Sequence, residues 1–294
     1  MKILRAFSIA GVMAATGLTG CFRTVHVVQR TMPPEMYRSA PVSVLEQEIS
    51  DRDASIQTLN ASVLITASTG GGKEGKVTTY TSFKGYIFVR KPRDLRVILQ
   101  LPVLGSQALD MVSDGQRFTL LIPPRSKAIE GSNTVSKPSK NGLENLRPGV
   151  FFDSLLVPGV SPEEFVSLTE ATRLLASQEK HRPTIEEPDY DLAVLKQKQG
   201  NTLRLERIVH ISRVTMLPFQ QDIYDVEGRV VTRATYERYE TFNGIQFPTL
   251  INISRPIDEY ALKVDVTKLT LNQKLEDDQF ELKIPPGVTV QHMD

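Results

Sequence analysis

Short runs of β-branched and aliphatic residues, separated by Gly, Pro and Asp, make up most of this chain after its first 60 residues. The first set is SVLITAS, FKGYIFVRK, DLRVILQL, QALDMVS and RFTLLI. The second set is YDLAVLK, LRLERIVHI, RVTMLPFQQDIYD, RVVTRATYERYE, IQFPTLINISRP and YALKVDVTKLTLN. Runs of this length with turn residues between them are typical of antiparallel strands. The sequence therefore predicts a mainly β protein with about eleven strands in one large curved sheet.

The remaining segments predict helices and loops. Apolar residues at 42, 45, 49, 56 and 59 follow a helical spacing and predict one amphipathic helix over 42–59. Residues 143–176 predict two short helices, because Pro148 precedes the apolar run GVFFDSLLV and SPEE at 161–164 is typical of a helix N-terminus. The polar stretch from Arg125 to Gly142 predicts a long exposed loop. We expect an incomplete barrel that the helices close, with an apolar concave face suited to a long apolar ligand.

The first 21 residues have the order of a secretory signal. Lys2 and Arg5 precede the apolar run AFSIAGVMAATGL, which is too short to span a bilayer and ends in LTGC. That ending resembles a bacterial lipobox, and Cys21 is the only cysteine of the 294 residues. The pattern predicts a signal peptide over 1–20, an acylated N-terminus and tether over 21–41, and a single domain over 42–294. By the sorting rule of such lipoproteins, Phe22 after the acylated Cys21 indicates the outer membrane.

The sequence offers little for catalysis. It contains no GxSxG, HExxH, Gly-rich phosphate loop or CxxC motif, and its four histidines are isolated from one another. The acidic run EEPDYD at 186–191 follows a proline, which favours a solvated turn over a metal site. Without residues 1–20 the charges are nearly balanced, which gives no support for nucleic-acid binding. We expect no enzyme, no cofactor and no metal.

One long stretch resembles a known family. GYIFVRKPRDLRVILQLPVLGSQALDMVSDGQRFTLLIPPRSKA follows the order seen in bacterial lipoprotein-sorting proteins of the LolA and LolB type. The shared features are a strand, a KP turn followed by Arg, a second strand, and a DG turn before the next strand. PVLGS is similar to the protruding loop of the LolB receptor, whereas LEDDQFELKIPPGV near the C-terminus is similar to the LolA carrier. The resemblance implies a half-barrel closed by helices that holds acyl chains without catalysis.

The PVLGS turn is the main candidate site. Hairpin turns at a surface are normally polar, yet this one carries Leu101, Val103 and Leu104. An apolar tip costs solubility unless it meets something apolar, such as the membrane interface or an arriving acyl chain. Two alternatives stay open, in which the middle helices of the domain cover the tip or the tip binds a protein.

Residues on the flanking strands are candidates for an acyl cavity. Strand parity places one set on a common face, although a solid core would use the same pattern. This set is Leu95, Val97, Leu99, Leu109 and Met111. Arg93 and Arg96 occupy the basic position of the family, where one of them could hold a lid by bonding carbonyl groups.

These features favour one function over another. The leading hypothesis is an outer-membrane lipoprotein that binds acyl chains and takes part in lipoprotein sorting or insertion. Its partners would be membrane lipid, acylated client lipoproteins and a periplasmic lipoprotein carrier. The alternative is a structural or assembly lipoprotein that keeps the fold with a filled core or binds another lipid. An apolar cavity of several hundred Å³ would favour the first, and a cavity-free core the second.

Overall fold

The computed structural model describes residues 31–32, 36–71, 75–133, 147–175, 184–198 and 200–293. The chain divides into two compact units. The smaller contains residues 1–33 and 174–186, where the short strand β1 (Thr31–Met32) pairs in parallel with Thr184 and Ile185. The larger contains residues 34–173 and 187–294.

Long strands make up most of the described chain. The strands of the first half are β2 (Thr58–Gly71), β3 (Lys76–Thr79), β4 (Phe83–Arg90), β5 (Asp94–Gln100), β6 (Gln107–Ser113), β7 (Arg117–Ile122) and β8 (Lys127–Ser132). Those of the second half are β9 (Glu164–Leu175), β10 (Thr184–Gln197), β11 (Leu203–Ser212), β12 (Pro218–Tyr224), β13 (Val230–Phe242), β14 (Ile245–Arg255), β15 (Tyr260–Leu271) and β16 (Thr289–Met293). The α-helices are α2 (Val42–Ala54) and α3 (Pro148–Leu155), and the short 3₁₀ helices are η2 (Pro123–Arg125) and η4 (Asp277–Phe280).

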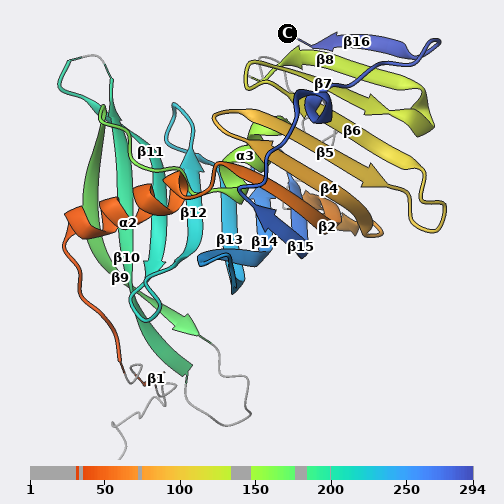
Figure 1. Cartoon of the computed structure of the whole chain (residues 1–294). Helices are drawn as coiled ribbons and strands as arrows, with labels where there is room; N and C mark the ends of the chain where they lie inside the picture. Colours follow the sequence, from red (N-terminus) through yellow and green to blue (C-terminus); the bar gives the residue numbers. More distant parts are fainter. Residues whose placement is uncertain are drawn as a thin grey trace, which may run out of the picture. The chain divides into compact units, whose positions relative to one another are not determined.

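These strands form one open sheet. Its order is β10-β11-β12-β13-β14-β15-β2-β4-β5-β6-β7-β8-β16, with β9 beside β10 and β3 beside β2. Neighbours are antiparallel except β16, which pairs in parallel with β8. In the described part of the chain the two ends of the sheet do not pair with each other, so the sheet stays an open half-barrel. Figure 1 shows β4 to β8 side by side in the order of the sequence.

Helix α2 packs on the β10–β11 end of the sheet. Its buried residues Leu45 and Ile49 are one helical turn apart and meet Leu192 of β10 and Val209 of β11 in a small separate core. The Tyr190 hydroxyl accepts a hydrogen bond from the backbone N–H of Ala40 at 3.0 Å, which joins the segment before the helix to the same strand. The helix expected over 42–59 therefore exists but ends at Ala54, because Thr58 already begins β2.

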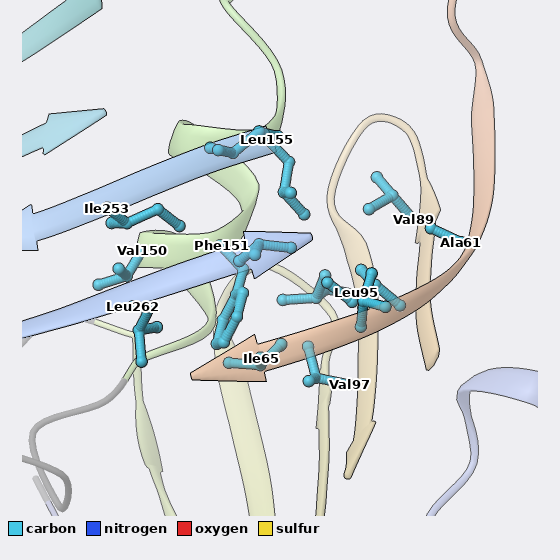
Figure 2. Close-up of a cluster of buried hydrophobic side chains, with 14 of the residues drawn as sticks. Ala61, Ile65, Val89, Leu95, Val97, Val150, Phe151, Leu155, Ile253 and Leu262 are labelled. Carbon is cyan, nitrogen blue, oxygen red and sulfur yellow. The ribbon is translucent and has the colours of Figure 1, made fainter. Parts of the chain in front are cut away.

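Helix α3 packs in the main core. Its Val150, Phe151 and Leu155 are buried among side chains from two distant parts of the sheet. Figure 2 shows Phe151 pointing between Leu95 and Ile65 of one part and Leu262 of the other. The largest buried side chain of this helix, Phe151, is 1% exposed. Burial of an aromatic side chain stabilises a fold by about 2–3 kcal/mol, so α3 acts as a hydrophobic plug on this face.

Three expectations for the middle of the chain are wrong. The second helix expected within 143–176 is strand β9, in which the partly buried Val166 and Leu168 alternate with exposed residues. Ser161 and Glu164 close a turn instead of a helix, because the Glu164 N–H donates to the Ser161 carbonyl at 2.9 Å. The loop expected after Pro124 contains β8, which pairs with β7. The sheet consequently has more strands than expected.

The third wrong expectation concerns the acidic run at 186–191. It lies in β10 and not in a solvated turn, with Glu187 and Asp189 buried. A pattern of acids alone indicates solvent exposure, whereas here basic and hydroxyl partners from neighbouring strands compensate the charges. Neither helix in the described part of the chain has the length and apolar character needed to cross a membrane.

Candidate functional site

The apolar turn between β5 and β6 is tightly built. The Leu101 N–H donates to the Ser106 carbonyl at 2.8 Å, and the Gly105 N–H donates to the Leu101 carbonyl at 3.0 Å. A third bond, from the Leu104 N–H to the Pro102 carbonyl at 2.8 Å, closes the tip. These backbone bonds give the turn a definite conformation, so its apolar side chains are held outward without support from side-chain packing.

The two tip side chains are exposed. Val103 is 105% exposed relative to a reference residue and Leu104 is 77% exposed, while Leu101 at the base is partly buried. No helix that the structure describes covers Val103 and Leu104. Among the described residues, nothing supports the alternative in which the middle helices cover the tip. Val103 also has φ of 70°, in the left-handed region that a β-branched residue rarely adopts. The turn thus combines an exposed apolar surface with backbone strain, a combination that occurs at functional sites.

The residues expected to line an acyl cavity form part of the main core. Leu95, Val97 and Met111 are buried, as is Leu99, and Leu109 packs against them in a partly buried position. They face the sheet side that α3 covers, as strand parity predicts. In the described conformation their contacts are with each other and with the helix, and a ligand that bound there would have to displace part of α3.

One cavity on this face is small. Beside the C-terminal end of α3 there is a cavity of about 30 Å³, lined by Leu155, Tyr236, Tyr239 and Phe247 among others. Pockets that enclose long apolar ligands are on the order of 300–1,000 Å³. A volume of 30 Å³ holds one water molecule and excludes an acyl chain.

Arg96 points to the other face of the sheet. Its guanidinium forms a two-point ion pair with the buried carboxylate of Asp110, and its Nη1 donates to the Gln279 carbonyl of η4 at 3.0 Å. Arg90, the last residue of β4, contacts the same segment. It donates to the Asp277 carboxylate at 2.8 Å, and its guanidinium lies 4.7 Å from the centre of the Phe280 ring. Arg96 therefore bonds a carbonyl group of the short 3₁₀ helix η4 in the C-terminal segment, and not one of α2 or α3.

Arg93 is the candidate arginine near α3. It is exposed, and its aliphatic part lies over Gly115 of the next turn, where a Cβ atom would come within 2.4 Å of it. It lines an open groove of about 400 Å³ whose other wall includes Pro148 and Asp153 of α3. The described structure gives Arg93 no hydrogen bond to the helix, so a role in holding α3 stays a prediction.

A charged cluster on β10–β13 escaped the sequence analysis. His210 Nδ1 lies 2.6 Å from Asp191 Oδ1, and its Nε2 lies 3.6 Å from Asp222 Oδ2. Arg233 donates to both carboxylate oxygens of Asp222 at 2.7 Å. Burial alone would lower the pKa of His210, but the carboxylates of Asp222 and Asp191 outweigh it and raise that pKa. Burial likewise opposes the effect of Arg233 on Asp222, whose pKa falls to about 2.

A second acid of this cluster behaves in the opposite way. Asp189 is buried, and desolvation raises its pKa to about 6 although the charge of Arg173 partly offsets this. Arg173 is shared, because its Nη2 donates to Glu187 at 2.6 Å and its Nε lies 3.5 Å from Asp189. The period-two spacing of Glu187, Asp189 and Asp191 was visible in the sequence, but only the register of β11 and β12 shows their partners.

Two further predictions concern metal binding and the lipid anchor. The described residues contain no group of three or more His, Cys, Asp or Glu side chains arranged to hold a metal ion. The predicted acylation site Cys21, with the leader before it, lies outside the described residues. Its role stays a prediction.

Comparisons with known proteins place the fold. No protein-family model and no curated protein matches the sequence. Among solved structures, the chain is similar to a LolA superfamily protein from Nitrosomonas europaea with a TM-score of 0.50 and 14% identity, over 81% of this chain and 97% of that one. It is equally similar to a DUF1329 family protein from Desulfovibrio piger, with a TM-score of 0.50 and 19% identity over 83% of this chain and 98% of that one. At these identities the likeness concerns the fold alone, which is similar to that of these two proteins and accords with the resemblance read from the sequence.

Proposed function

We propose that this chain is a lipid-anchored protein of the outer membrane that binds acyl chains and takes part in lipoprotein sorting or insertion. The observation that carries the proposal is the internally hydrogen-bonded, exposed and strained turn over Leu101–Ser106 on a half-barrel similar to that of a LolA superfamily protein. The predicted lipobox cysteine Cys21 supports it, because acyl chains hold a protein at a membrane surface.

The turn is suited to contact with hydrocarbon. Burying the exposed apolar surface of Val103 and Leu104 in a membrane interface, or against an arriving acyl chain, stabilises the encounter at about 25 cal/mol per Å² of apolar area. Three backbone hydrogen bonds within the turn lower the cost of moving its polar groups out of water.

Deep acyl binding on the concave face requires a change in α3. Leu95 borders the open groove of about 400 Å³ beside α3, but Val97 and Met111 are fully buried, so Phe151 and its neighbours must move before an acyl chain can contact those two residues. Replacing one apolar group by another keeps the burial of the sheet face nearly constant. The exchange is therefore feasible without a cofactor or nucleotide.

A second candidate function rests on the cavity of about 30 Å³ beside α3. The small size of this cavity and the burial of Val97 and Met111 favour a structural or assembly lipoprotein that keeps this fold without an acyl site. In that case the exposed turn would bind a protein of the envelope, and no acyl probe would enter the domain.

The test uses Leu104→Glu, with Val226→Glu as a matched control. Both residues are exposed apolar side chains in turns, and Val226 lies in the turn between β12 and β13. We expect the free energy of unfolding of both variants to lie within about 0.5 kcal/mol of the wild-type value. Delivery of an acylated client to liposomes should fail for Leu104→Glu alone, while binding of a fluorescent acyl probe persists in both.

Two outcomes would contradict the proposal. Normal delivery by Leu104→Glu would remove the turn from the mechanism. Absence of acyl-probe binding by the wild type would favour the structural alternative.

A further inference from the structure

The groove beside α3 combines apolar walls with two opposite charges. It has a volume of about 400 Å³ and lies between the β4–β5 turn and α3, and we call it the α3 groove. The charged residues that line it are Arg93 and Asp153. Sites for small ligands are typically apolar with a few polar groups at fixed positions. The apolar lining residues are Pro92, Leu95, Pro148 and Phe152.

Arg93 is the basic group of the α3 groove. Its aliphatic part packs over Gly115 of the β6–β7 turn, where an added Cβ atom would lie 2.4 Å from the Arg93 Cβ and 2.6 Å from its Cδ. This contact positions the side chain and leaves it exposed. The pKa of Asp114 is lowered chiefly by the backbone N–H groups of Arg117 and Gln116, with only a small contribution from Arg93. The Arg93 guanidinium is therefore accessible to an anion that enters the groove.

Asp153 is the acidic group on the helix wall of the α3 groove. Its Oδ2 lies close to Gly149 one helical turn earlier, where an added Cβ atom would be 3.7 Å away. The side chain is exposed to the groove, yet the protein around it desolvates the carboxylate enough to raise its pKa to about 6. The charges of Arg207 and Arg255 oppose this shift without cancelling it.

The two arginines that act on Asp153 have acids of their own. Arg207 pairs with Glu164 at 3.1 Å, and Arg255 pairs with Asp258 at 2.7 Å. Within the part of the chain that the structure describes, the Asp153 carboxylate has no ion-pair partner. A desolvated carboxylate without a paired cation raises the free energy of the folded chain, so a cationic group of a ligand would be bound favourably there.

We propose that the α3 groove binds the zwitterionic headgroup of a phospholipid, with Arg93 bonding the phosphate and Asp153 bonding a primary ammonium. The inference rests on the proposed function, because Leu95 in the groove wall belongs to the sheet face on which acyl chains would bind. The planar guanidinium of arginine matches the oxygens of a phosphate. An ethanolamine headgroup carries both charges on one short linker, and its ammonium donates hydrogen bonds that a choline headgroup lacks.

The test separates the headgroup from the acyl chains. The full chain in maltoside micelles is titrated with three soluble glycerophosphodiesters, and binding is measured by saturation-transfer NMR. Glycerophosphoethanolamine carries a phosphate and an ammonium, glycerophosphoglycerol a phosphate alone, and glycerophosphocholine a cation without N–H groups. Glyceryl-cysteine amide, with a free α-ammonium and no phosphate, represents the N-terminus of a lipoprotein as the other source of an ammonium. Binding of a fluorescent acyl probe is measured in parallel and reports on the proposed function separately.

We expect glycerophosphoethanolamine to bind about tenfold more tightly than the other two diesters, the scale of one charged hydrogen bond. Asp153→Asn should remove this preference and leave glycerophosphoglycerol binding unchanged, whereas Arg93→Gln should weaken all three diesters. Arg117→Gln removes a positive charge from the neighbouring turn, and Glu163→Gln changes an exposed acid outside the groove. Both controls should bind like the wild type. Thermal unfolding confirms that each variant is folded.

Three results would overturn the inference. Equal affinity for the three diesters, or binding of none, would show that the α3 groove does not recognise headgroup charge; the proposed function would survive if the acyl probe still bound. An ethanolamine preference that persists in Asp153→Asn would place ammonium recognition elsewhere. Tight binding of glyceryl-cysteine amide that Arg93→Gln does not change would show that the groove binds a lipoprotein N-terminus and not a phospholipid.

Discussion

Arg96 and Asp110 pair diagonally across β5 and β6, with Nε 3.0 Å from Oδ1 and Nη2 2.8 Å from Oδ2. Asp110 is almost fully buried, and the same guanidinium also holds the Gln279 carbonyl of the C-terminal segment. One side chain therefore both neutralises a buried charge and fastens the segment after β15 to the outer face of the sheet.

Removing this arginine should destabilise the fold. We expect Arg96→Ala to lower the free energy of unfolding by about 3 kcal/mol, because it leaves a buried carboxylate unpaired. Amide exchange should rise in residues 275–281, which lose an anchor. The double variant Arg96→Met, Asp110→Leu should recover most of the stability, as measured by urea unfolding. Equal losses in the single and double variants would show that the C-terminal anchor, and not the buried charge, dominates.

Relieving the strain at the tip should separate stability from function. Asn adopts positive φ more readily than Val. We therefore expect Val103→Asn to raise the free energy of unfolding, by at most about 1 kcal/mol. Because the variant replaces an exposed apolar side chain by a polar amide, its insertion into liposomes should weaken. A clear loss of stability would mean that the conformation of this turn depends on the valine side chain.

Truncating the plug should loosen the concave face. Phe151→Ala is expected to cost about 3–4 kcal/mol of unfolding free energy, the usual range for a buried aromatic residue. If α3 must leave for acyl chains to bind, the variant should also bind an acyl probe more tightly than the wild type. Val209→Ala in the separate α2 core destabilises the chain without touching α3 and serves as the control. Tighter probe binding in both variants would indicate general unfolding instead of release of the plug.

Stability should fall as pH rises through the range in which Asp189 titrates. Its folded pKa of about 6 lies above the ordinary 3.8, so between these values the folded chain keeps a proton that the unfolded chain has lost. The contribution is fully present below pH 3.8 and is lost as pH rises through about 6, a change of up to about 3 kcal/mol. Asp189→Asn should remove this slope and be more stable than the wild type at pH 7.5, measured by urea unfolding at several pH values.

Two comparisons isolate that effect. Glu163→Gln changes an exposed acid and should leave the slope unchanged. His210, whose folded pKa is raised, contributes stability that is present below pH 6.5 and lost above it, so His210→Gln should act only in the higher range. An unchanged slope in Asp189→Asn would assign the pH dependence to other groups.

The sequence by itself determined the class of the fold and the faces of its strands. Period-two alternation depends only on which side of a strand each residue occupies, so Leu95, Val97 and Met111 could be placed on the buried side of the sheet. The short strands and turns also predicted a large, incomplete barrel, and the apolar composition of the β5–β6 turn marked it as a candidate site before its exposure was known.

Tertiary structure alone decided the rest, because the deciding contacts join residues far apart in the chain. SPEE at 161–164 satisfies the local preferences of a helix start, yet pairing with β10 makes the following residues a strand. Asp189 and His210 look like isolated charged residues until the register of β10, β11 and β12 brings them among their partners. Whether the concave face is open or filled depends on where Phe151 of α3 packs, and that follows from the shape of the whole sheet and not from any local pattern.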